Sequence, residues 1–122
     1  MAKTELIVHL GVEGGGATIH RTPRAAGGYQ FHVEGSSLSL DENDNENWRE
    51  WTLEPVETIQ EALGCVEKDD LWIFFHPILV HPDYRVAVWQ RVQELARAVP
   101  DERTSTWNNR VHDWRRVCLP GP

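Results

Sequence analysis

Three histidines in the first third of the chain are placed so that they could bind a metal ion. His9, His20 and His32 lie in segments where apolar and polar residues alternate, the pattern of β-strands. We expect Gly14 and Gly15 to form a two-residue turn, which places His9 opposite His20 and His32 diagonal to His20. Directly opposite strand residues lie ~5 Å apart and diagonal ones ~7–8 Å apart. Three imidazoles at these distances could hold zinc with one open position. The alternative is that they are polar side chains on a solvent-facing surface.

A second group of polar and aromatic residues could act as an acid/base site. His81 stands before Pro82, which is favoured in the first turn of a helix, and Asp83 follows where the helix dipole favours an acid. His81 could therefore transfer protons beside Asp83, or it could cap the start of the helix. The residues of this candidate cluster are His76, His81, Asp83, Tyr84 and Trp89. No Ser or Cys stands in a recognisable nucleophile motif, so we assign no catalytic residue.

The middle of the chain is strongly acidic and carries two tryptophans. Residues 34–70 contain twelve acidic and two basic side chains, a net charge of −10, whereas the whole chain has −7. Such a surface repels phosphate backbones, so we expect no binding to nucleic acid. Exposed aromatic residues beside dense acid are typical of a surface that binds a basic protein. The predicted partner-binding residues are Asp41, Glu42, Asp44, Glu46, Trp48 and Trp51.

The periodicity of apolar residues predicts an α+β fold in one domain, residues 1–122. Period-two alternation predicts an N-terminal antiparallel β-meander of three or four strands, with Leu10 opposite Ile19 and a short fourth strand at 37–40. An acidic loop at 41–47, which we expect to be flexible, follows the meander. Beyond it we expect a buried strand at 71–75, an extended segment at 76–82, and about three helices packed on the meander, at 58–68, 82–98 and 104–118.

The remaining signals concern compartment and cofactors. Cys65 and Cys118 have neither the spacing of a metal motif nor that of a disulfide framework. No N-terminal segment resembles a signal peptide, and no apolar run approaches the ~20 residues that span a bilayer. We therefore expect a cytoplasmic protein that needs no cofactor and no membrane. A homo-oligomer is an open alternative.

One segment resembles a known family. The residues Trp72, Pro77-Ile78-Leu79-Val80-His81-Pro82-Asp83-Tyr84 and Val88-Trp89 match, in order, a motif of small, uncharacterised bacterial proteins. Gly14-Gly15, Thr58-x-x-Glu61 and Trp114 match the same pattern, so the resemblance covers about residues 6–118. The resemblance implies the fold predicted above, and the family supplies no activity to transfer.

The function that these patterns favour is binding of another protein. An acidic surface with neighbouring tryptophans is typical of an immunity or antitoxin-like protein that blocks a basic partner. The alternative is a metal-binding protein or small hydrolase that uses the surface histidines.

Overall fold

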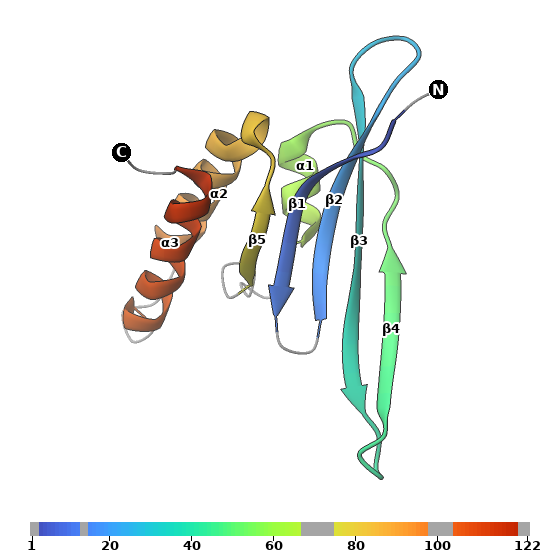
Figure 1. Cartoon of the computed structure of the whole chain (residues 1–122), viewed down its shortest axis with the longest axis vertical. Coiled ribbons are helices and arrows are strands. Elements are labelled where there is room, and N and C mark those ends of the chain that lie inside the picture. The colour runs from blue at the N-terminus through green and yellow to red at the C-terminus, as the bar shows by residue number, and fades with distance from the viewer. Residues whose placement is uncertain (1–2, 13–14, 67–74, 98–103, 120–122) are drawn as a thin grey trace.

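The protein has the predicted α+β architecture. The computed structural model describes residues 3–12, 15–66, 75–97 and 104–119. Its strands are β1 (Glu5–Val12), β2 (Gly15–Pro23), β3 (Tyr29–Leu40), β4 (Glu46–Thr52) and β5 (His76–Val80). The helical elements are α1 (Ile59–Val66), the short 3-10 turn η2 (Pro82–Tyr84), α2 (Arg85–Arg97) and α3 (Thr104–Cys118) (Figure 1). The three predicted helices are therefore confirmed within a few residues of their expected ends.

The strands form one antiparallel sheet in the order β4-β3-β2-β1-β5. The first four strands are a meander, as predicted. The fifth strand comes from the segment expected to be extended, and it pairs with β1. Of the strand predicted at 71–75, residues 71–74 lie outside the described part of the chain.

The register of the first hairpin differs from the prediction by two residues. Leu10 lies opposite Ala17, and Val8 rather than Leu10 lies opposite Ile19. Gly15 and Gly16 are strand residues that pair with Val12 and Gly11, and an added Cβ on Gly16 would lie 2.6 Å from the carbonyl oxygen of Leu10. Glycine thus permits close strand approach here rather than only a turn. From Val8 onward, a slip of two keeps each side chain of β1 on its predicted face, whereas an irregularity in the register between Leu6 and Val8 places Ile7 in the core as well.

The predicted fourth strand at 37–40 is wrong. Residues 37–40 continue β3, and the fourth strand is formed by residues 46–52, including the two tryptophans. β3 passes through Gly35 without a break and pairs there with Trp51 of β4. The indole of Trp51 lies against the backbone of Gly35, where a Cβ would clash. The expected acidic loop is shorter than predicted, because its last two residues belong to β4.

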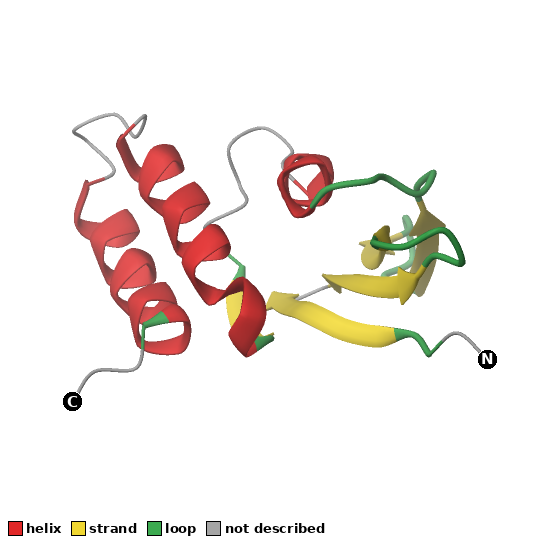
Figure 2. Ribbon diagram, turned by 90° about the horizontal axis from the view of Figure 1, so that it is seen from above, coloured by secondary structure: helices red, strands yellow, loops and turns green. Residues whose placement is uncertain are grey.

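The helices cover one face and one edge of the sheet. Figure 2 shows α1 over the sheet, with α2 and α3 together beside β5. Leu10 and Ile19 share one core with Val88 and Trp114, and all four side chains are fully buried. The expected packing of helices on the meander is therefore confirmed. No helix of the described residues covers the other face of the sheet, which faces the viewer in Figure 1 and is called the open face below.

Candidate functional site

The three predicted metal ligands lie on the open face, but they do not form a metal site. His20 lies directly opposite His32, whereas His9 lies opposite Thr18 because of the two-residue slip. His20 Nδ1 is 3.5 Å from a carboxylate oxygen of Glu34 instead. Within the described ranges, no group of three or more His, Cys, Asp or Glu side chains could hold a metal ion. The interpretation of these histidines as polar side chains of an open face fits the structure.

A shallow hollow of about 570 Å³ lies in the middle of the open face. Gly11 and Gly16 pair across β1 and β2, so its floor there carries no side chains. Ile78 on β5 and Trp48 on β4 line it from opposite edges of the sheet, and both side chains are more than half exposed. Glu34 is among the acidic residues that line it. The hollow thus combines apolar edges with negative charge.

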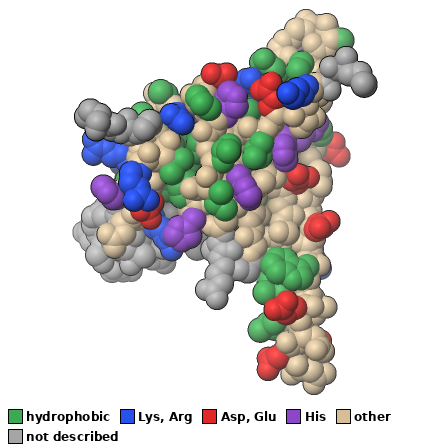
Figure 3. Space-filling model, in the orientation of Figure 1, with side chains coloured by type: hydrophobic (Ala, Val, Ile, Leu, Met, Phe, Trp, Pro, Cys, Tyr) green, Lys and Arg blue, Asp and Glu red, His purple; other side chains and the backbone are tan. Residues whose placement is uncertain are grey.

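The acidic residues lie on an arm that extends from the sheet. Beyond the pair Gly15–Ser37, β3 has no β2 partner, so residues 38–48 project past β1 and β2 (Figure 1). We call residues 38–48 the arm. Its side chains are exposed, with Leu38 half-buried. In Figure 3 acidic and apolar side chains lie side by side on it. The four acids predicted to bind a partner are therefore all in one accessible place.

The tip of the arm is an ordered turn built around Asp41. Its carboxylate accepts hydrogen bonds from the backbone amides of Asn43 and Asn45, at 2.8 and 2.9 Å, and from the side-chain amide of Asn45 at 3.1 Å. These bonds favour the charged carboxylate and lower the pKa of Asp41 below its ordinary 3.8. Asp44 adopts a left-handed φ of 60°, which Asp tolerates. Asp41 is thus committed to the turn, whereas Glu42 and Glu46 make no such contacts within the described residues.

The two tryptophans of β4 point to opposite faces of the sheet. Trp48 and Trp51 are three residues apart, and successive strand residues alternate between faces. Trp48 is on the open face and is 58% exposed. Trp51 is half-buried against the core beside Gly35. Only Trp48 is therefore available as an exposed aromatic contact on the open face.

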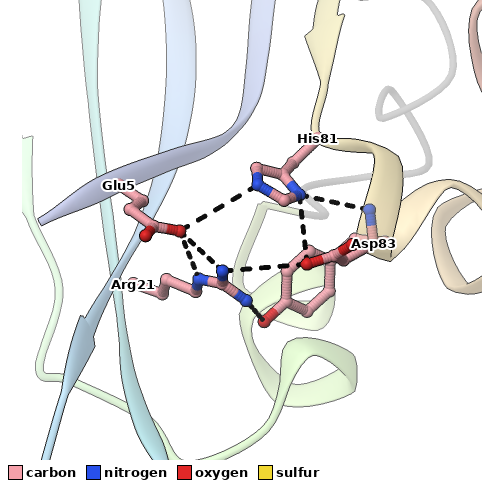
Figure 4. A network of polar contacts seen from close by, with 5 residues as sticks. Glu5, Arg21, His81 and Asp83 are labelled. Carbon is pink, nitrogen blue, oxygen red and sulfur yellow. Dashed lines mark hydrogen bonds and ion pairs between the residues drawn. The ribbon is translucent and has the colours of Figure 1, made fainter.

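A polar network joins the sheet to the start of α2 (Figure 4). Arg21 is only 8% exposed; its Nε donates to a carboxylate oxygen of Glu5 at 2.8 Å, and its Nη2 forms an ion pair with the same oxygen at 2.6 Å. Its Nη1 donates to the hydroxyl of Tyr84 at 2.8 Å, and its guanidinium carbon lies 4.2 Å from the ring centre of Tyr29. Desolvation by burial works to lower the pKa of Arg21, but its bonds with Tyr84 and Glu5 outweigh burial and raise it. The arginine thus stays charged and bridges β1, β2 and η2.

His81 caps the helical segment, as one of the two interpretations predicted. Its Nδ1 accepts a hydrogen bond from the backbone amide of Asp83 at 3.1 Å. Its Nε2 is 4.0 Å from Glu5, and Asp83 lies 3.8 Å from both His81 Nδ1 and Arg21 Nη2. The ring is partly exposed, since 27% of the side chain is accessible. Arg21 and Glu5 hold this end of the fold together, and neither was predicted.

The other members of the predicted His81 cluster lie elsewhere. His76 is at the opposite end of β5, where its ring nitrogens contact Arg110. Trp89 lines a different hollow together with His112 and Arg115 on α3. Cys118 is buried among apolar side chains, which raises the pKa of its thiol to about 12. The cluster therefore reduces to His81, Asp83 and Tyr84, without a nucleophile beside them in the described residues.

Comparison with known proteins gave no matching family model, no matching curated protein and no matching solved structure. The resemblance to a bacterial family therefore stays a prediction. No helix in the described part of the chain is long and apolar enough to cross a membrane.

Proposed function

We propose that this protein is a non-enzymatic binding protein, of the immunity or antitoxin type, that binds a basic partner protein with its arm. The arm carries the proposal, because residues 38–48 project from the body of the molecule with their acids exposed. Negative charge on such an extension attracts and orients a basic protein before contact. Trp48 at the base of the arm supplies an exposed aromatic surface of the kind that anchors interfaces.

The hollow on the open face extends this surface. It begins beside Trp48 and is lined by Glu34 and Glu50. A partner side chain with an apolar stem and a cationic end, such as lysine or arginine, suits a hollow with apolar edges and carboxylates. Contacts along both the arm and the hollow would give the partner more area than the arm alone.

The test reverses charge without disturbing the turn. Asp41 is left unchanged because its carboxylate holds the turn, and Glu42→Lys is combined with Glu46→Lys. The matched control, Glu54→Lys with Glu94→Lys, makes the same change in net charge at exposed positions outside the arm. The protein and both variants are immobilised and exposed to lysate of the native host. Retained proteins are then identified, and their affinities are measured with purified components.

We expect a basic protein to be retained by the unchanged chain and by the control. The arm variant should weaken its affinity by about tenfold or more, since two attractions become repulsions. Raising the salt from 0.05 to 0.5 M should weaken binding as well, because the Debye length falls to roughly a few Å and the attraction between exposed charges is screened. Retention that is equal for both variants and insensitive to salt would contradict the proposal.

A further inference from the structure

A second groove lies at the other edge of the sheet, where β5 meets α2 and α3. Its volume is about 480 Å³. Three of its lining residues carry nitrogen-bearing side chains, namely His81, Arg85 and Arg116. The others present apolar side chains, and no Asp or Glu is among the described residues that line it. In Figure 3 apolar side chains gather over β5, with basic side chains over α3 beside them.

Among the described residues, Arg85 is a charged side chain without a compensating partner. Its Nε is buried, and no hydrogen-bond acceptor in the described part of the chain lies within reach of it. No carboxylate of the described residues forms an ion pair with its guanidinium, in contrast to Arg21. A guanidinium nitrogen that loses hydration without gaining an acceptor is energetically unfavourable. The rest of the partly exposed Arg85 side chain lines the groove, and an anion there would supply the negative charge that no described carboxylate supplies to it.

Arg116 brings a second positive charge to the same groove from α3. Its only described ion-pair contact is with Asp113, at 3.8 Å, and 74% of its side chain is exposed. An exposed pair at this distance contributes little and leaves the guanidinium available. Two arginines from different helices can each donate to a planar oxyanion.

The apolar lining indicates what the anion is attached to. Leu6, Leu79, Val80 and Val117 form much of the groove, and Leu79 is 41% exposed. Inorganic phosphate would leave this surface in contact with water, whereas an aliphatic chain would cover it. A carboxylate on an apolar chain satisfies both parts of the groove.

We infer that the groove between β5, α2 and α3 binds a carboxylate that carries an apolar chain, with Arg85 and Arg116 as the anion ligands. The carboxylate can belong to a small aliphatic acid or to a peptide that ends in an apolar residue. The groove lies away from the arm, since β4 and β5 are the two opposite edges of the sheet, although Ile78 lines both the groove and the hollow. The inference rests on Arg85 and Arg116, which line the groove and not the hollow.

The test is an NMR titration of the isotopically labelled full chain. The probes are hexanoate, hexanol, inorganic phosphate, and a tetrapeptide ending in leucine with a free or an amidated C-terminus. Arg85→Gln removes the charge inside the groove. The matched control is Arg97→Gln, which makes the same change on the same helix at an exposed position outside the groove.

We expect hexanoate, the free-carboxylate peptide or both to shift the backbone signals of Leu79 and His81. Arg85→Gln should weaken that binding by about tenfold or more, and Arg97→Gln by less than about twofold. Should Arg85→Gln fail to fold, Arg116→Gln is the substitute. It changes an exposed side chain and should weaken binding by roughly threefold.

The probes also separate the sources of the carboxylate. Tighter binding of hexanoate than of the peptide assigns the groove to a small acid. Tighter binding of the free peptide, lost on amidation, assigns it to a chain terminus. The inference is overturned if neither binds, if hexanol or phosphate binds as well as hexanoate, or if Arg85→Gln and Arg97→Gln have equal effects.

Discussion

Replacing Arg21 with methionine tests whether the network around it is what joins the sheet to α2. The substitution removes two short contacts to Glu5 and the bond to Tyr84. A hydrogen bond to a charged group contributes ~1.5–3 kcal/mol. Glu5 and Asp83 are each more than a third exposed, so water can replace part of what they lose. Methionine also fills the buried space without a desolvation cost. We expect a net loss of ~2 kcal/mol in the free energy of unfolding.

The assay is thermal and urea unfolding followed by circular dichroism. For a domain of this size, 2 kcal/mol corresponds to a fall in Tm of ~8 °C. The matched control is Arg24→Met, which breaks the Arg24–Glu57 ion pair at 3.1 Å between exposed side chains. That pair should contribute less than ~0.5 kcal/mol, or about 2 °C in Tm. Equal destabilisation by the two variants would show that the buried network does not hold this end of the fold.

Three further predictions concern single positions. The hydrogen bonds from backbone and side-chain amides lower the pKa of Asp41, so the turn is intact at neutral pH and loses these bonds only as the pH falls through that lowered pKa, below 3.8. An NMR titration of the backbone amides that donate to Asp41 should show this midpoint. A midpoint at or above 3.8 would contradict the prediction. Gly35→Ala should lower the free energy of unfolding by ~1–3 kcal/mol, because the added Cβ meets an indole ring. Gly64→Ala, in open space within α1, should raise it by ~0.5–1 kcal/mol. Urea unfolding measures both changes, and effects of the same sign would refute the packing argument. Burial raises the pKa of Cys118 to about 12, so in a Cys65→Ser variant no thiol should react quickly with a disulfide reagent at pH 8; a fast reaction there would show that Cys118 is accessible.

The fold was predictable where local patterns decide it. Alternation in the first third predicted the first three strands of the meander, and helical spacing in the last half predicted the three helices within a few residues. The helix predicted to begin at residue 58 begins at Ile59, and Thr58 Oγ1 caps it by accepting from the Glu61 amide at 3.1 Å. Gly27 and Gly28, between β2 and β3, both adopt positive φ, at 102° and 76°, a conformation that glycine adopts readily.

Register and length of the strands depended on contacts that the sequence does not display. Three consecutive glycines offer several turn positions, and the pairing of Gly15 with Ser37 on a third strand decides among them. In the same way, the glycine at position 35 favours a break in a strand by local propensity. The indole of Trp51 covers it instead, sixteen residues along the chain.

The polar groups were hardest to predict, because their partners are distant in sequence. Arg21 follows Ala17 and Ile19 at period two, so the alternation itself places it on the helix side of the sheet. That position was a usable signal, since a charged residue on a core face needs a partner. Its partners come from β1 and η2, however, and no local pattern identifies Tyr84 as one of them. For Arg85 the relevant fact is the absence of a described partner, which only the packed structure can reveal.

The distribution of charge connects the two binding surfaces. Residues 34–70 have a net charge of −10 and include the arm, whereas residues 71–122 have +2 and include both arginines of the groove. The sheet order puts β4 at one edge and β5 at the other, so the acids of the arm and the two arginines of the groove are separated by the width of the sheet. Opposite charges that lay closer together than the Debye length, ~10 Å at 0.1 M salt, would largely cancel each other's electrostatic field. Because they are separated, a cation is attracted to the arm while an anion is attracted to the groove, and each surface keeps the electrostatic selectivity that its own residues provide.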